Sequence, residues 1–316
     1  MKITLCNFRN IVNNILFADS KKIFLSAFFS FFFLVSFAQN AYYDWAKNIG
    51  STGSDCSNSI AVDGSGNVYI TGYFQGTADF DPGSGTVNLT AVGTSYDIFL
   101  AKYSSSGNYI WAKSIGSTDY DYGRSIAVDG SGNVYITGYF RGTADFDPGS
   151  GTVNLTPVGG YDIFFAKYNS SGNYIWAKNI GSTVSDYGLS IAVDGSGNVY
   201  ITGYFNGTAD FHPGAGTVNN TSVSGSSDIF FAKYSSIGNY LWAKRIGGTS
   251  NDYSNSIAVD GSGNVYITGY FSGTADFDPG SATVNLTSVG GSPDIFFAKY
   301  NSSGNYIWAK NIGSTV

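Results

Sequence analysis

The sequence predicts an all-β protein, a β-propeller built from four-stranded antiparallel blades of about 66 residues. The first observation is a repeat: tryptophans 66, 65, 66 and 66 residues apart are separated by nearly identical sequence, at Trp45, Trp111, Trp176, Trp242 and Trp308. The second is that each repeat holds four apolar segments of strand length, separated by glycine-containing turns. The third is composition, because the chain is rich in Tyr, Phe, Val, Ile, Thr and Gly and its 22 acidic residues are all aspartate. Such a composition disfavours helices.

The first element is a predicted export signal at residues 1–38. An uncharged apolar run follows Lys21 and Lys22 and ends in small residues at Ala38. Basic, apolar and small segments in this order are typical of a signal peptide, here cleaved after Ala38. The apolar run is shorter than the roughly 20 residues of a membrane-spanning helix. We therefore expect a secreted or cell-surface protein with no membrane span in the mature chain, residues 39–316.

Charge and cysteine content narrow the classes of function. The net charge is −6 and the pI is near 4.6, so the chain lacks the basic surplus that neutralises phosphates, and we expect no nucleic-acid partner. Removal of residues 1–38 takes away more basic than acidic residues and makes the mature chain more acidic still. Cys6 leaves with the signal, and the remaining Cys56 cannot form an internal disulfide or a CxxC metal site.

The remaining chain consists of four near-identical sequence repeats. The predicted units are residues 51–116, 117–181, 182–247 and 248–313. In the first unit, short glycine-containing loops join the first strand to the second and the third to the fourth, as in β-hairpins. The second to fourth strands are apolar on both faces, which is typical of sheets covered on both sides. A β-solenoid is the alternative architecture, and it favours shorter coils than this period.

The phrases IAVDGSGNVYITGYF and DIFFAKYNSSGNYIWAKNIG resemble the bacterial β-propeller repeat family known as SBBP repeats, over residues 45–316. The resemblance implies an exported bacterial protein, often joined to adhesion modules or a C-terminal type IX sorting domain, and it supplies no catalytic residues. One count is unusual, because the chain has five WAK segments and four copies of everything else. Two explanations stay open: the chain is a fragment of a longer array, or four blades close into a ring and one WAK segment is redundant.

The long connection between the second and third strands contains the motif Asp-Phe-Asp-Pro-Gly. Two carboxylates one residue apart can point the same way on an extended chain, and calcium prefers several hard oxygen ligands. The alternative is a plain turn in which the first aspartate accepts hydrogen bonds from its own backbone. The calcium candidates are Asp79, Asp81, Asp145, Asp147, Asp210, Asp276 and Asp278. His212 replaces the second aspartate in the third unit, which we expect to bind calcium worst.

A second candidate site lies in the connection into the first strand of each unit. This connection holds an aspartate in every unit and, in three units, a tyrosine directly after it. Long loops of a propeller share one face, and loops on a rigid scaffold commonly bind ligands, so we expect a ligand face where tyrosine can stack on sugars. Its candidate residues are Asp55, Asp121, Tyr122, Asp186, Tyr187, Asp252 and Tyr253. Aromatic residues within strands are assigned to the core, and the repeated Asp-Gly-Ser-Gly-Asn to hairpin turns.

The sequence offers little for catalysis, because it has one histidine, one cysteine after signal removal, no glutamate and four near-identical units. An active site needs an asymmetric set of acid, base and nucleophile. We therefore predict a non-catalytic binding or adhesion scaffold, secreted or displayed at the cell surface, for a polysaccharide or a surface protein held by repeated weak contacts. Two alternatives stay open: a structural spacer in a larger surface protein, and an accessory domain of a secreted hydrolase.

Overall fold

The computed structural model describes residues 44–315, so the predicted export signal at residues 1–38 lies outside the described part. Strands and turns make up nearly all of it, with one short 3-10 turn, η1 (Val223–Gly225). Within these residues no helix is long and apolar enough to cross a membrane. The predicted all-β repeat fold is confirmed.

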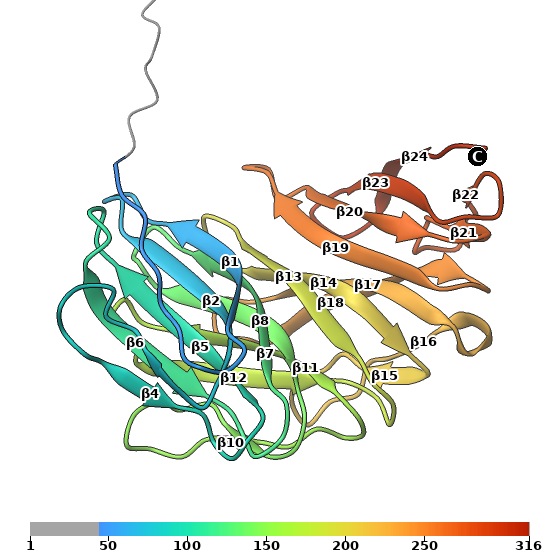
Figure 1. The fold of residues 1–316 in the computed structure, drawn as a ribbon. Coiled ribbons are helices and arrows are strands. Elements are labelled where there is room, and N and C mark those ends of the chain that lie inside the picture. The colour runs from blue at the N-terminus through green and yellow to red at the C-terminus, as the bar shows by residue number, and fades with distance from the viewer. Residues whose placement is uncertain (1–43, 316) are drawn as a thin grey trace, which may run out of the picture. The chain divides into compact units, whose positions relative to one another are not determined.

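Each repeat forms one four-stranded antiparallel sheet, called a blade here, and Figure 1 shows the four blades in chain order. The strands of blade one are β1 (Cys56–Val62), β2 (Val68–Gln75), β5 (Tyr96–Tyr103) and β6 (Tyr109–Ile115). Those of blade two are β7 (Tyr122–Val128), β8 (Val134–Phe140), β11 (Asp162–Tyr168) and β12 (Tyr174–Ile180). Those of blade three are β13 (Tyr187–Val193), β14 (Val199–Asn206), β17 (Ser227–Tyr234) and β18 (Tyr240–Gly248). Those of blade four are β19 (Asp252–Val259), β20 (Val265–Phe271), β23 (Asp294–Tyr300) and β24 (Tyr306–Ile312).

The long connection between the second and third strands of each blade contains a small hairpin, which the sequence analysis did not foresee. The four hairpins are β3 (Thr77–Asp79) with β4 (Asn88–Thr90), β9 (Ala144–Asp145) with β10 (Asn154–Leu155), β15 (Thr208–Asp210) with β16 (Asn219–Thr221), and β21 (Thr274–Asp276) with β22 (Asn285–Thr287). In the fourth repeat this hairpin also pairs with β18 of the preceding blade. The hairpins therefore help to join consecutive blades.

Two tight turns define one edge of every blade, the hairpin edge, and the long connections define the opposite loop edge. In blade one, Asp63 accepts a hydrogen bond from the Gly66 backbone N–H (2.9 Å) and donates its own to the Asn67 carbonyl (3.0 Å). Gly66 has a φ of +80°, a conformation that residues with a Cβ rarely adopt, so the turn requires glycine there. The repeated Asp-Gly-Ser-Gly-Asn segments thus form the hairpin turns that the sequence predicts.

The first strand of each blade is bulged, and a glycine on the second strand makes room for it. In blade one the register shifts between Ser57 and Ser59, opposite Gly72. A Cβ on Gly72 would lie 1.9 Å from the Cys56 carbonyl oxygen, so only glycine fits. The same arrangement recurs in the other three blades, which explains the glycine of the Thr-Gly-Tyr-Phe segment in every repeat.

The hydrophobic cores lie between consecutive blades. Ile98, Leu100 and Ile115 of blade one are buried together with Ile126 and Phe140 of blade two. Equivalent clusters join blades two and three, and blades three and four. Each blade is thus covered on both faces where it has two neighbours, which explains why its strands are apolar on both sides.

Repeated hydrogen bonds also connect the blades. The indole N–H of Trp111, on the last strand of blade one, donates to the Ser170 carbonyl in a hairpin turn of blade two (3.1 Å). The Ser59 hydroxyl of blade one accepts from the Ile126 backbone N–H (3.2 Å), which satisfies a donor on an edge strand. Both bonds recur between blades two and three and between blades three and four.

The leading WAK segment lies on blade one in the place that a preceding blade's last strand would take. The Trp45 indole donates to the Ser105 carbonyl (3.0 Å), as Trp111 does to Ser170 one repeat later. Gly50 forms an isolated β-bridge with Asp79, and Gly116 does the same with Asp145. This short segment covers the face only in part, so Ile60 is 65% exposed, whereas its equivalents in blades two to four are 5–6% exposed.

Candidate functional site

Seven tyrosines form a continuous row along the loop edge of the four blades, and we call them the tyrosine row. They alternate between the start of a first strand and the end of a second strand. All are half-buried except Tyr270, which is 38% exposed. The row consists of Tyr73, Tyr122, Tyr139, Tyr187, Tyr204, Tyr253 and Tyr270. The predicted ligand-face tyrosines Tyr122, Tyr187 and Tyr253 therefore share one surface with four strand tyrosines that the sequence analysis assigned to the core.

The rings of the tyrosine row are in contact from end to end. Neighbouring ring centroids lie 4.4 to 5.0 Å apart, within the range of favourable aromatic contacts. Half of these contacts join the two strands of one blade, and the other half cross from one blade to the next, as between Tyr204 and Tyr253 (4.4 Å). Cys56 occupies the position opposite Tyr73 where later blades have a tyrosine, so the row begins one ring short.

The chemistry of the row is that of neutral phenols. Burial and the neighbouring tyrosines raise the pKa of Tyr122, Tyr204 and Tyr270 above the ordinary value. The rings are therefore uncharged hydrogen-bonding groups with apolar faces at physiological pH. This combination suits flat ligands that carry both C–H faces and hydroxyls.

The predicted ligand-face aspartates lie in the interior, except in blade one. Asp121, Asp186 and Asp252 are fully buried, whereas Asp55 is exposed. The Asp121 carboxylate accepts hydrogen bonds from the backbone N–H groups of Ser117 (2.6 Å) and Arg141 (3.2 Å). It thereby fastens the connection from the preceding blade to the end of the second strand. The tyrosines, and not these three carboxylates, are what the surface presents to solvent.

A second buried aspartate is the first or second residue of the third strand of each blade: Asp97, Asp162, Asp228 and Asp294. Burial raises the pKa of Asp97, Asp162 and Asp228 in this set and of Asp121, Asp186 and Asp252 in the other, because removal from water disfavours the charged carboxylate. The pKa of Asp162 rises to about 6, that of Asp97, Asp186 and Asp252 to about 7, and that of Asp121 to about 8. The loop edge therefore holds a layer of carboxyl groups that titrate near neutral pH.

The Asp-Phe-Asp-Pro-Gly loops have the geometry of turns. One Asp79 carboxylate oxygen accepts hydrogen bonds from the backbone N–H groups of Asp81 (3.0 Å) and Val87 (2.8 Å). Asp81 accepts from the Gly83 N–H (2.8 Å). Within residues 44–315, no three His, Cys, Asp or Glu side chains gather in a way that could hold a metal ion. Calcium binding by these aspartates stays an untested prediction, and the observed bonds are those of the alternative, a plain turn.

The third repeat shows what the second aspartate of this motif does. His212 stands at that position, and its Nδ1 accepts a hydrogen bond from the Gly214 N–H (3.2 Å), as the Asp81 carboxylate does from Gly83. Asp210 keeps both of its backbone bonds. At this position an imidazole nitrogen or a carboxylate oxygen can thus accept the hydrogen bond of the turn.

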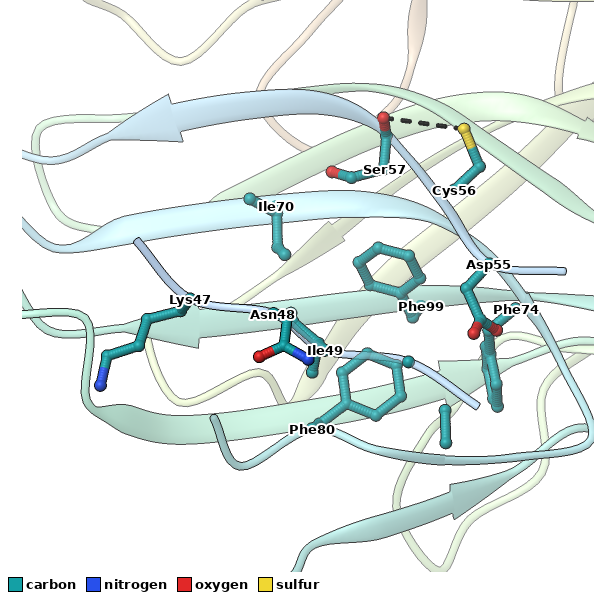
Figure 2. Close-up of a pocket in the computed structure, with 12 residues that line it drawn as sticks. Lys47, Asn48, Ile49, Asp55, Cys56, Ser57, Ile70, Phe74, Phe80 and Phe99 are labelled. Carbon is teal, nitrogen blue, oxygen red and sulfur yellow. Dashed lines mark hydrogen bonds between the residues drawn. The ribbon is translucent and has the colours of Figure 1, made fainter. Parts of the chain in front are cut away.

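A cavity of about 290 Å³ lies between the leading segment and blade one, and Figure 2 shows its lining. Ile49 and Ile70 face it together with Phe74, Phe80 and Phe99. In blades two to four the equivalent face is buried against the preceding blade. In blade one the leading segment covers this face only in part, and the cavity is the space that it leaves. The Cys56 thiol beside it contacts the Ser57 carbonyl oxygen (3.9 Å) and the Asn58 side-chain oxygen (3.6 Å).

Two arginines near the tyrosine row were missed by the sequence analysis. Both belong to blade two: Arg124 lies near Tyr73 of blade one and Tyr139 of blade two, and Arg141 lies near Tyr161 of blade two. The signal in the sequence was a departure from the repeat, because the other three blades have no basic residue at either position.

Four interlocking blades with identical hairpin turns define a β-propeller repeat protein. The SBBP family, described as a Beta-propeller repeat, matches residues 44–77, 110–139, 175–212 and 241–277. The chain carries four copies of this repeat and belongs to the SBBP repeat family, as the resemblance in sequence implies.

Relatives outside this family description are distant. The chain is 27% identical over 322 residues to an uncharacterized WD repeat-containing protein of Acanthamoeba polyphaga mimivirus, covering 86% of this chain and 23% of that protein. It is 27% identical over 201 residues to the regulatory protein FlaEY of Caulobacter vibrioides, covering 62% of this chain and 20% of FlaEY. The chain thus spans about a fifth of the length of these relatives. A crystal structure of a Bacteroides caccae protein of unknown function aligns over 81% of each chain, with 11% identity and a TM-score of 0.36.

Proposed function

We propose that the protein is an exported, non-catalytic scaffold that binds a polysaccharide along the tyrosine row. The observation that supports this proposal is the row itself, in which seven rings from four blades form one unbroken aromatic surface. Tyrosine presents a large, rigid contact area at low conformational cost and adds a hydroxyl for hydrogen bonding.

Repetition suits the row to a repetitive ligand. Three of the four blades supply a pair of row tyrosines in register, Tyr122 with Tyr139, Tyr187 with Tyr204, and Tyr253 with Tyr270. A polymer with a repeating unit can contact several such pairs at once. Individually weak contacts then add, because the later ones form within a complex that already exists.

The proposal is of a non-catalytic protein because the histidine and the buried aspartates take part in structural hydrogen bonds. His212, the one histidine, uses its Nδ1 to accept a turn hydrogen bond. The buried aspartates with raised pKa values lie at equivalent positions of successive blades and accept backbone hydrogen bonds. Repeated carboxyls in structural contacts differ from the single asymmetric set that an active site needs. Export is supported by the basic, apolar and small segments of residues 1–38.

The test is binding of the purified full chain to a panel of soluble polysaccharides, followed by titration calorimetry of those that bind. Tyr187→Ala and Tyr270→Ala should weaken binding about tenfold or more, because each removes one stacking surface. Tyr187→Phe and Tyr270→Phe are matched controls that keep the ring, and they should retain most of the affinity. Unchanged affinity in both alanine variants would remove the row as the binding surface, whereas no binding to any polysaccharide would favour the spacer alternative.

A further inference from the structure

Blade two departs from its three neighbours at the loop edge. Its first strand has Arg124 where the other blades have Asn58, Leu189 and Asn255. Its second strand is followed by Arg141 where the others have Gln75, Asn206 and Ser272. The connection into blade two adds Tyr120, which is 42% exposed, where the others have Ser54, Ser185 and Asn251. In a chain of near-identical repeats, all three departures therefore belong to the loop edge of blade two.

These departures surround one ring of the tyrosine row, Tyr122. Tyr120 is stacked with it, at an interplanar angle of 11° and a centroid distance of 6.5 Å. Tyr96 and Tyr161 also contact it edge-on, at 5.7 and 6.3 Å. The aromatic surface is therefore widest at blade two.

Both arginines lie within this widened part. Burial raises the pKa of the row tyrosines Tyr73 and Tyr139, and the Arg124 guanidinium opposes that rise at both. Arg124 thus lies near tyrosines of two blades. The Arg141 guanidinium lies close to the Tyr161 hydroxyl and likewise opposes the rise in the pKa of Tyr161.

Neither arginine forms an ion pair with another residue of the described part of the chain. The ion pairs among residues 44–315 are Lys102–Asp63, Lys233–Asp194 and Arg245–Asp228. Asp121, whose carboxylate accepts a hydrogen bond from the Arg141 backbone N–H, is fully buried and accepts a second one from the Ser117 backbone N–H. Asp119 on the same loop forms no ion pair with either arginine. Two guanidinium groups without an ion pair therefore lie at the loop edge of a protein whose net charge is −6.

We propose that the tyrosine row binds an acidic polysaccharide, one that carries carboxylate or sulfate groups, with its charged groups at Arg124 and Arg141 of blade two. The planar guanidinium binds such groups through paired N–H donors, while Tyr120 and Tyr122 contact the sugar faces. Arginine among aromatic rings is suited to this role because it is weakly hydrated and always charged. The inference rests on the function proposed above and narrows its ligand class.

The experiment compares polymers that differ only in charge. Polygalacturonate and its methyl ester share a backbone, as do dextran sulfate and dextran, so the two pairs separate carboxylate from sulfate recognition. Titration calorimetry of the full chain should show at least about tenfold tighter binding of the charged member in one pair. The double variant Arg124→Gln/Arg141→Gln should abolish that preference, and Arg124→Lys/Arg141→Lys should restore part of it.

Control variants separate the inference of an acidic ligand from the broader proposal that the tyrosine row binds a polysaccharide. Lys310→Gln removes an exposed charge from blade four and should leave the preference unchanged. If it lowers the preference as much as the arginine pair does, the attraction is non-specific and the inference is overturned. If charged and neutral polymers bind equally while Tyr187→Ala still weakens both, the acidic ligand is wrong and the tyrosine row stands. If no polysaccharide binds, both proposals fail.

Discussion

Both ends of every blade hold aspartates, and the two ends set their charge in opposite ways. At the hairpin edge of blade two, Asp129 accepts four hydrogen bonds, from Ser131, Tyr135 and both nitrogens of Asn133. Burial alone would raise the pKa of Asp129, but these bonds outweigh it and lower the pKa. At the loop edge, Asp162 accepts from the Val158 N–H (3.0 Å) while its second oxygen lacks a partner, and burial raises its pKa to about 6.

The difference shows that the number of hydrogen bonds donated to its carboxylate, and not the residue type, determines whether an aspartate removed from water is charged. Blade three makes the same point within the loop edge. There Arg245 stands where blade two has Asn179, and its guanidinium lies 2.6 Å from the Asp228 carboxylate. Burial still raises the pKa of Asp228, but Arg245 opposes the rise.

The largest expected effect is a loss of stability between pH 4 and pH 8. In this range the folded protein holds protons on loop-edge aspartates that the unfolded chain has already released, so the free energy of unfolding falls as pH rises. One net proton across two pH units corresponds to about 2.7 kcal/mol. Urea denaturation at pH 4, 6 and 8 measures the trend. The hairpin aspartates act with the opposite sign, and their stabilisation is lost below about pH 4, which places the optimum near that value. A flat profile from pH 4 to pH 8 would contradict the raised pKa values.

Replacing Arg245 with asparagine makes blade three resemble blade two. We expect a loss of about 2 kcal/mol in the free energy of unfolding at pH 8, because Asp228 keeps its burial and loses its cation. At pH 5 the loss should be smaller, since the isolated carboxyl can then take up a proton. Denaturation of wild type and Arg245→Asn at both pH values tests this, and an equal loss at both would show that Arg245 acts only through its apolar contacts.

At the hairpin edge, Asp129→Ala should cost about 1.5 kcal/mol, because four hydrogen bonds are lost and the buried Tyr135 loses its acceptor. In contrast to Arg245→Asn, the cost should be the same at pH 6 and pH 8, since the pKa of Asp129 lies below both. Equilibrium unfolding at the two pH values gives the comparison. A cost that changed between them would mean that the hairpin carboxyl titrates near neutral pH.

The smallest expected effect is a gain. Asn179→Arg places a guanidinium beside Asp162 as Arg245 lies beside Asp228, and should stabilise the protein by about 1 kcal/mol at pH 8. The gain is limited because the Asn179 hydrogen bond to the Thr156 carbonyl (3.2 Å) is lost. Thermal unfolding at pH 5 and pH 8 measures it, and Asn179→Lys is the control for charge without the planar fork. Destabilisation at pH 8 would show that blade two has no room for the longer side chain.

The blades and their hairpin turns were predictable because local chemistry dictates them. The Asp63 turn requires its Asp, Gly and Asn at fixed spacing, and the period of the tryptophans reports the blade repeat. The small β3–β4 hairpin was missed, since its strands are three residues each and carry few apolar residues. Strand periodicity cannot reveal elements of that length.

The candidate site was predictable only in part. The loop position of Tyr122 suggested exposure, but Tyr139 lies within an apolar strand, and only the inter-blade geometry shows that its ring joins the row. The burial of Asp121 was likewise hidden, because loop aspartates are usually solvated and this one is enclosed by backbone from two connections. Both facts depend on contacts between residues that are distant in the chain.

The repeated contact between blades has a consequence for assembly kinetics. Trp111 and Trp176 donate the same hydrogen bond to equivalent hairpins of successive blades, and the serine contacts are equally alike. Any blade can therefore recognise any other, within one molecule or between two. The order of blades is enforced mainly by the short connections between them. During refolding, correct pairing must compete with out-of-order and intermolecular pairing, a known failure of repeat proteins, and dilution should favour the correct product.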